Sequence, residues 1–279
     1  MEPLRIISME LSTGGRVENY FRILAGTNVK YITIQAGALD DDSLLDMPLD
    51  FHNILPPLPY DKDNWNQAYI SRNAASGKLE PTLSKTELPG VQTIWHSETV
   101  SFLDLERTKQ LTLLAQESIW KQEQNSTEGS PGSESQTKRT IISKMARFHW
   151  EVQYIEAETR IYQRLQPLGI GPKFLGHVHE AGRVMGFILE KVDGRHAGWE
   201  DLEVCQAALR RLHGLGIAHG DCNRYNFIIG PDDNVTLIDF EKAIVNADLE
   251  MMEREISGLE EQLREETGRG GGFILEESD

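Results

Sequence analysis

The chain has 279 residues, 39% of them apolar and 26% charged, which is enough for one large or two small domains with a buried core. Its 44 acidic and 28 basic residues give a net charge of −16. That charge argues against a general nucleic-acid or anionic-membrane binder, because such proteins bind phosphate groups through Lys and Arg. The sequence also lacks an apolar run near the roughly 20 residues that cross a bilayer.

The N-terminal segment and the cysteines indicate the cellular compartment. Residues 1–11 include two glutamates and lack the long apolar core of a secretory signal. Cys205 and Cys222 are the two cysteines, and their spacing suits neither a disulfide framework nor a metal site. We therefore expect a cytoplasmic protein in a reducing environment.

The first hundred residues have the pattern of an irregular, partly β segment. Residues 4–11 predict a strand, and residues 16–24 and 29–36 predict a hairpin. The proline-rich stretch 54–59 favours extended, irregular chain. We interpret residues 1–100 as an N-terminal extension that could supply a surface for a protein partner.

The next part of the chain is more regular. Residues 110–121 predict one or two strands, residues 140–146 a short strand and residues 150–165 a helix. Between the strands, residues 125–137 (NSTEGSPGSESQT) contain no apolar side chain, so we expect a mobile insertion.

One charged residue lies on the apolar face of the helix predicted over 150–165. Ile155, Tyr162 and Leu165 form a stripe at helical spacing, and Glu158 falls on the same stripe. An unpaired buried carboxylate is very costly, so Glu158 needs a cationic partner.

The remaining elements alternate short strands and helices. Asp201 is a candidate N-cap for the first of the two later helices. The predicted elements are paired strands at 173–179 and 183–191, a helix from 202 to 212, short strands at 227–229 and 235–238, and an amphipathic helix at about 247–266. A flexible tail is expected over 269–279.

The motif most specific for function lies between these two helices. It contains His219-Gly220-Asp221, then Asn226, and then Asp239-Phe240. Two short strands around a turn would bring Asp221, Asn226 and Asp239 to one end of a small sheet. Oxygen ligands beside a free carboxylate suit a bound Mg²⁺ with a nearby proton acceptor.

This spacing resembles the catalytic core of the protein-kinase-like superfamily, H-x-D-x-x-x-x-N followed by D-F-G. The His-Gly-Asp form is most similar to the aminoglycoside-phosphotransferase branch. The chain also resembles a group of kinase-like proteins of filamentous fungi, through the segments DNWNQAYIS, LPGVQTIWH, EAETRIYQRL, GIGPKFLGH, HAGWEDLE and LHGLGIAHGDCNRYNF. The resemblance implies an α+β, two-lobe kinase-like fold, with a small mainly β N-lobe over 101–192 and a truncated C-lobe over 193–268.

The resemblance also implies roles for the motif residues, with ATP and Mg²⁺ as cofactors. Asp221 would accept the proton of the attacking hydroxyl, or orient that hydroxyl. Asn226 and Asp239 would ligate the Mg²⁺ that bridges the ATP phosphates.

Further roles fall on residues before the motif. Lys144 would hold the α- and β-phosphates, with Glu158 as its helix partner. Glu190 and Val192 belong to the segment that would bind the adenine edge through backbone groups.

Departures from the family pattern leave two functions open. Glu241 stands where a glycine follows Asp-Phe, and the expected phosphate-covering loop near residues 114–118 contains no glycine. No activation segment follows, so an active enzyme would phosphorylate a small-molecule hydroxyl rather than a protein, or activate a metabolite carboxylate. The alternative is a pseudokinase-like binding module.

Overall fold

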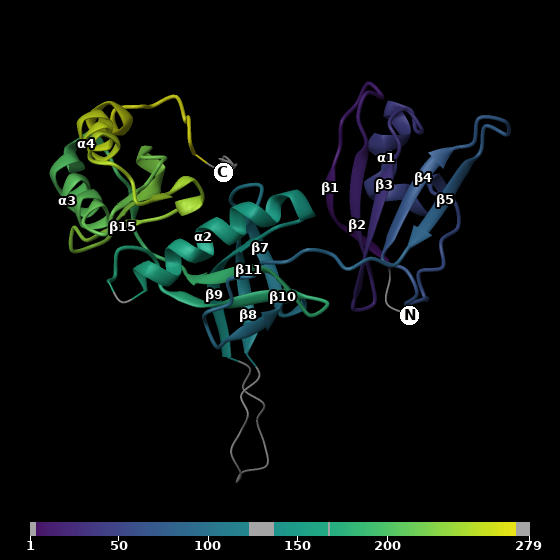
Figure 1. Ribbon diagram of the computed structural model, residues 1–279, viewed down its shortest axis with the longest axis horizontal. Helices are drawn as coiled ribbons and strands as arrows, with labels where there is room; N and C mark the ends of the chain where they lie inside the picture. Colours follow the sequence, from purple (N-terminus) through teal and green to yellow (C-terminus); the bar gives the residue numbers. More distant parts are fainter. Residues whose placement is uncertain (1–3, 123–136, 167, 272–279) are drawn as a thin grey trace, which may run out of the picture. The chain divides into compact units, whose positions relative to one another are not determined.

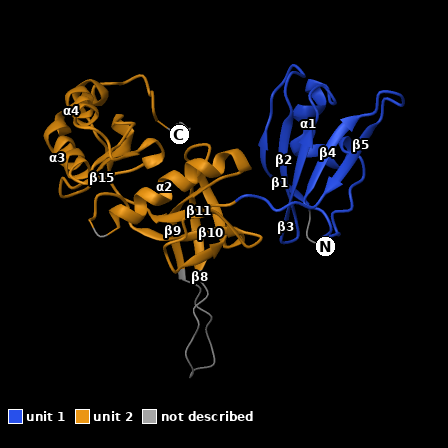
Figure 2. Cartoon of the chain, viewed as in Figure 1, with its two compact units in different colours: residues 1–89 blue, residues 90–279 orange. Residues whose placement is uncertain are grey.

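The computed structural model describes residues 4–122, 137–166 and 168–271 (Figure 1). The chain divides into two compact units, residues 1–89 and 90–279 (Figure 2). Residues 125–136 of the predicted insertion lie outside the described residues, and so does the predicted tail beyond residue 271. Both units combine strands and helices, which confirms the mixed α+β class.

The described part of the first unit is a five-stranded sheet in the order β1-β2-β3-β4-β5, with one helix. Its elements are β1 (Arg5–Glu10), β2 (Asn19–Ala25), β3 (Asn28–Ile34), α1 (Asp41–Ile54), β4 (Gln67–Arg72) and β5 (Leu79–Ser84). The predicted first strand and hairpin are confirmed. β3 and β4 are parallel, and α1 makes the crossover between them, as parallel neighbours require (Figure 1).

The helix α1 was not predicted, because its sequence opens with a run of aspartates and contains Pro48. Asp40 is its N-cap, and the carboxylate accepts a hydrogen bond of 2.7 Å from the backbone N–H of Ser43. Met47 and Phe51 are buried against the sheet. Capping and burial therefore stabilise the helix despite the proline.

The second unit begins with a six-stranded sheet in the order β6-β10-β11-β9-β8-β7 among its described residues. The strands are β6 (Thr99–Ser101), β7 (Leu105–Gln110), β8 (Ala115–Gln122), β9 (Thr137–Met145), β10 (Phe174–Glu180) and β11 (Arg183–Glu190). A 3-10 turn, η1 (Phe102–Asp104), links β6 to β7, and η2 (His149–Glu151) leads into α2 (Val152–Leu165), which packs on β11. The strands and the helix predicted in this region are confirmed.

The sequence predicted a phosphate-covering loop near residues 114–118. The structure corrects this position, because the turn between β7 and β8 covers residues 111–114. Ala115 and the three residues after it lie in β8 and pair with β9. Glu117 lies within β8, opposite Ile142 of β9, and its carboxylate lies 2.6 Å from the Lys191 ammonium. This ion pair lowers the pKa of Glu117, with Thr108 as a further hydrogen-bond donor.

Residues 90–98 are part of the second unit. The N–H of Val91 donates to Val184 of β11 at 2.8 Å, and the Trp95 ring lies 4.4 Å from the Phe174 ring between centroids. The N–H groups of Trp95 and His96 donate to Nε2 of the buried His177, at 3.2 and 3.3 Å. Burial lowers the pKa of His177 to about 4, so the ring is neutral and accepts both bonds.

The rest of the second unit holds two small sheets, ordered β12-β14-β15 and β13-β16 within the described residues, and two helices. Its elements are β12 (Arg195–His196), η3 (Trp199–Asp201), α3 (Leu202–His213), β13 (Ile217–Ala218), η4 (Arg224–Asn226), β14 (Phe227–Ile229), β15 (Val235–Leu237), η5 (Phe240–Lys242), β16 (Ile244–Val245) and α4 (Leu249–Leu263). Both predicted helices are confirmed, and α3 packs against α4. The Asp201 carboxylate accepts from Gly198 and Arg195 rather than from the first turn of α3, which corrects its predicted capping role. No helix in the described ranges has the length and apolar character needed to span a membrane.

Candidate active site

A buried lysine on β9 is surrounded by carboxylates from two other parts of the second unit. The Lys144 Nζ lies 2.6 Å from Glu158 Oε2, 2.6 Å from Asp239 Oδ1 and 3.4 Å from Glu241 Oε2. The side chain of Lys144 is 8% exposed and that of Glu158 is 1% exposed. Burial alone would lower the pKa of Lys144, but the Glu158 and Asp239 carboxylates outweigh it and raise that pKa. Lys144 is therefore charged at neutral pH.

Glu158 lies on the inward face of α2, between Ile155 and Tyr162, which are also buried. Its Oε1 accepts a hydrogen bond of 3.2 Å from the backbone N–H of Phe240. Burial raises the pKa of Glu158 to about 7, although Lys144 acts in the opposite direction. One ammonium cannot neutralise the three carboxylates around it, so the cluster has excess negative charge that a further cation would offset.

Asp239 adopts a backbone conformation that is unusual for a residue with a side chain. Its φ and ψ are 62° and 67°, in the left-handed region, which costs about 1–2 kcal/mol for a non-glycine residue. The ion pair to Lys144 and the bond from the next N–H to Glu158 hold this conformation in place. With this backbone conformation, the Asp239 carboxylate lies beside Lys144. Strained backbone of this kind is found where the position of a side chain matters for function.

Aromatic rings connect the cluster to the loop before Asp221. The Phe240 ring centroid lies 5.2 Å from that of His219 and 5.4 Å from that of Tyr162, and Tyr162 in turn lies 6.0 Å from Phe174. His219 Nε2 is 3.0 Å from the Ile238 carbonyl oxygen, and burial lowers the pKa of its ring. A neutral His219 therefore acts as a packing and hydrogen-bonding residue of the loop.

Asp221, Asn226 and Asp239 lie at one end of the β14–β15 hairpin. Asn226 directly precedes β14 and Asp239 follows β15 by two residues, and the two strands are antiparallel. The Asn226 amide donates to the Asp221 carbonyl oxygen at 2.9 Å, and the Ile238 N–H donates to the Asn226 carbonyl oxygen at 3.0 Å. The Asp221 carboxylate is 32% exposed and pairs with Lys242 at 3.0 Å.

Gly220, next to Asp221, is a position that no other residue can occupy without rearrangement. Its φ is 80°, and a Cβ on it would overlap the carbonyl group of Lys242. The close approach of these two segments therefore requires glycine, and it places Lys242 within reach of Asp221.

A carboxylate from α4, not identified from the sequence, holds this loop. Glu255 accepts hydrogen bonds from the backbone N–H of Gly220 at 2.6 Å and of His219 at 3.0 Å, and lies 2.7 Å from His213 Nε2. These donors lower the pKa of Glu255 against the opposing effect of its burial. Glu255 follows Met252 by three residues and precedes Leu259 by four, so it lies on the apolar stripe of α4 as Glu158 does on that of α2.

We expect Glu255→Ala to lower the free energy of unfolding by about 2 kcal/mol, because two loop N–H groups and a histidine lose their acceptor. Urea unfolding measures this change. Glu250→Ala is the matched control, since Glu250 lies on the same helix with an 81% exposed side chain and should change stability little. Equal stabilities of the two variants would contradict the role given to Glu255.

Glu190 and Val192 lie at the end of β11 and just beyond it, away from the Lys144 cluster. The Glu190 N–H donates to the Lys173 carbonyl oxygen at 2.9 Å, and its carboxylate pairs with Arg139 at 3.4 Å. Val192 makes no backbone hydrogen bond with any residue that the structure describes. The backbone of Val192 is therefore free to bind another group.

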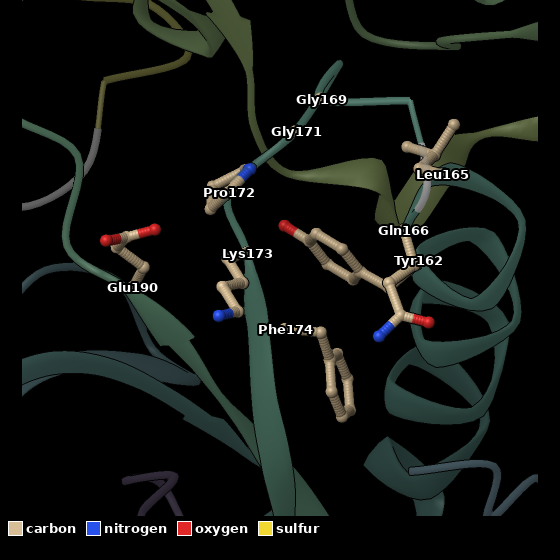
Figure 3. Close-up of a pocket in the computed structure, with 9 residues that line it drawn as sticks. All are labelled: Tyr162, Leu165, Gln166, Gly169, Gly171, Pro172, Lys173, Phe174 and Glu190. Atoms are coloured by element: carbon tan, nitrogen blue, oxygen red, sulfur yellow. The ribbon is translucent and has the colours of Figure 1, made fainter.

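A pocket of about 560 Å³ opens beside Glu190 on the side that faces α2 (Figure 3). Tyr162 of α2 and Pro172, Lys173 and Phe174 at the start of β10 line it. The lining of this pocket does not include Lys144, Asp221, Asn226 or Asp239. We therefore distinguish it from the candidate active site.

The described residues contain no group of three or more His, Cys, Asp or Glu arranged to hold a metal ion. A site for Mg²⁺ does not need one, since this ion often takes one or two protein ligands and completes its shell with phosphate oxygens and water. Two side-chain oxygens, Asn226 Oδ1 and Asp239 Oδ2, accept no hydrogen bond within the described part of the chain. They therefore fit such a site.

The comparisons with known proteins bear on the second half of this site. Residues 190–266 match the model of the lipopolysaccharide kinase (Kdo/WaaP) family. The matched stretch contains Asp221, Asn226, Asp239 and Glu255, whereas Lys144 and Glu158 precede it. No curated protein matches the chain. The chain is therefore similar to a kinase-like family over the Asp221 loop and α4, and its resemblance to the aminoglycoside branch and to the fungal group stays a prediction.

Proposed function

We propose that the protein is an ATP- and Mg²⁺-dependent phosphotransferase that acts on a small-molecule hydroxyl. The observation that supports this most strongly is the contact of Lys144 with both Glu158 and Asp239, at 2.6 Å each. It joins a strand, a helix and the strained turn after β15 in one charged cluster. The similarity of residues 190–266 to a lipopolysaccharide kinase family supports the same class of reaction.

The two-lobe division belongs to this proposal. The sheet of β6–β11 with α2 would form the N-lobe over 101–192, and α3, α4 and the small sheets would form the C-lobe over 193–268. Residues 190–192 would then join the lobes. The free backbone of Val192 suits the edge of an adenine ring, which presents one donor and one acceptor.

The charges of the cluster suit a nucleotide. Lys144 would bind phosphate oxygens through its ammonium group, which Glu158 holds in place. Asn226 and Asp239 would hold Mg²⁺, which would offset negative charge on the phosphates. Preorganised charges of this kind stabilise the charge that develops during phosphoryl transfer.

Asp221 would act on the acceptor. Its carboxylate takes the proton of the acceptor hydroxyl as the acceptor oxygen bonds to the γ-phosphorus. The bond from that phosphorus to the β,γ-bridging oxygen breaks, and ADP leaves with the electron pair. Lys242 lies 3.0 Å from the Asp221 carboxylate, and this contact raises the pKa of Lys242.

The pseudokinase-like binding module remains the second candidate. The turn at residues 111–114 lacks glycine, so its side chains restrict how closely the backbone can approach a phosphate. Glu241 adds a carboxylate 3.4 Å from Lys144. Both features would weaken nucleotide binding without removing the fold.

Thermal unfolding with Mg²⁺-ATP, compared with ATP plus a chelator, tests the proposal. A ligand at one hundred times its Kd stabilises a protein by about 2.7 kcal/mol, so we expect a clear rise in Tm that requires the metal. The rise should be lost in Asp239→Ala and kept in Asp232→Ala, which alters an exposed turn residue. A wild-type Tm that millimolar Mg²⁺-ATP leaves unchanged would favour the binding module.

A further inference from the structure

A second pocket in this unit lies directly beside Asp221. Its volume is about 440 Å³, and Asp221 and Cys222 line one side. Met251, Arg254 and Gly258 of α4 line the other side. The proposed function leaves this pocket without a role, although it places open space next to the carboxylate that would take the proton.

Gly258 has no packing reason to be a glycine. It lies inside α4, where glycine is the least favourable residue apart from proline, and its φ is not positive. A Cβ added to it would meet no atom within 4 Å. The missing side chain therefore leaves the floor of the pocket open at a cost to the stability of the helix.

Arg254 is the cationic side chain among the residues that line the pocket, beside the carboxylates of Asp221 and Glu255. Glu255 already accepts from two backbone N–H groups and contacts His213, and Asp221 pairs with Lys242. Arg254, by contrast, donates only its Nε, to the Glu250 carbonyl oxygen at 3.3 Å.

The Arg254 guanidinium has only a weak ion-pair partner. Its Nε lies 3.8 Å from the carboxylate of Glu250, whose side chain is 81% exposed. Its terminal nitrogens have no partner in the described part of the chain. A guanidinium with free N–H groups at the wall of a pocket is suited to a carboxylate or a phosphate.

We propose that this pocket binds the phosphoryl acceptor and that the acceptor is a small hydroxyl compound with an anionic group. The anionic group would contact Arg254, and the hydroxyl would reach Asp221, where the transfer described above takes place. Gly258 provides the space between them. This inference rests on the proposed function and adds the class of acceptor to it.

The test uses the full-length protein, radiolabelled Mg²⁺-[γ-³²P]ATP and a protein-free small-molecule extract of cells that make the protein. The extract is separated on an anion exchanger at pH 7 into a retained and an unretained fraction. We expect label to pass to a compound in the retained fraction. The Tm shift with Mg²⁺-ATP is measured on the same samples.

Two tryptophan substitutions on α4 provide the matched pair. Gly258→Trp fills the pocket and should lower transfer at least about 100-fold, while the Tm shift with Mg²⁺-ATP is kept. Glu261→Trp adds the same side chain at an exposed position of α4 that does not line the pocket, so it should keep transfer.

Arg254 is tested in the same assay. Arg254→Gln should raise the KM for the retained compound about 10- to 100-fold through loss of a charge-assisted contact. Arg254→Lys should recover part of that loss, since it keeps the charge but not the paired N–H groups. An unchanged KM in Arg254→Gln would overturn the assignment of the anionic group to this residue.

The outcomes separate the inference from the function on which it rests. Three outcomes would overturn the acceptor site alone, provided that Mg²⁺-ATP still raises Tm. They are transfer of label to the unretained fraction, full transfer by Gly258→Trp, and transfer to neither fraction. If Mg²⁺-ATP does not raise the Tm of the wild type, the proposed function fails and this inference fails with it.

Discussion

Asp221→Ala is expected to lower the rate of phosphoryl transfer by about 10²- to 10⁴-fold, the usual contribution of a positioned general base. The substitution removes the carboxylate that lines the acceptor pocket and pairs with Lys242. Nucleotide binding should change little, because the groups that would bind phosphates and metal are Lys144, Asn226 and Asp239. Single-turnover transfer to the acceptor measures the first effect, and the Tm shift with Mg²⁺-ATP measures the second.

The control for this experiment is Asp232→Ala, which removes an exposed carboxylate from the turn between β14 and β15. It should leave both measurements at their wild-type values. Asp221→Asn separates charge from shape, since the amide keeps the volume but cannot accept the proton. Transfer by Asp221→Asn at the wild-type rate would show that Asp221 only orients the acceptor.

The sequence predicted the second unit well because its elements have strong local patterns. The helical stripe that contains Glu158 and the paired strands after it need no tertiary information to be recognised. α1 was missed because an aspartate run and a proline hide a short helix that capping and burial stabilise. Helices of this kind depend on contacts with the rest of the unit, which a local pattern does not contain.

The site itself was only partly predictable, and the reason differs for each residue. Glu158 was singled out because a carboxylate on an apolar stripe demands a partner, and the same argument applied to α4 would have identified Glu255. The left-handed backbone of Asp239 and the close approach of Gly220 to Lys242 result from tertiary contacts. No residue pattern reports such geometry, so these two features could come only from the structure.

The same tertiary contacts position the site residues without any bound ligand. Glu255 fixes the loop that holds Asp221, while Glu158 fixes both Lys144 and the backbone of Phe240. Each carboxylate comes from a helix packed on the core. The groups that would act on phosphate and acceptor are thus positioned by the same helices that complete the fold, and substitutions among them should affect stability and function together.

The largest such effect is expected for Lys144→Met. Removing the ammonium leaves Glu158, which is 1% exposed, and the carboxylates of Asp239 and Glu241 without their shared cation. Breaking a buried ion pair from one side costs about 3–5 kcal/mol, so the free energy of unfolding should fall by that amount. The Tm shift with Mg²⁺-ATP should be lost as well. Urea unfolding and the nucleotide-induced shift measure the two losses separately.

A second substitution distinguishes an unpaired charge from a packing defect. Lys144→Met combined with Glu158→Leu removes both partners, and replacing a buried pair by apolar groups is often neutral, so most of the lost stability should return. Nucleotide binding should not return, because the ammonium is still missing. Lys138→Met, on an exposed position of the same strand, is the control. If the double variant is no more stable than Lys144→Met, the unpaired charge of Glu158 does not cause the loss of stability. The Lys144–Glu158 ion pair then contributes less to the free energy of unfolding than its short distance implies.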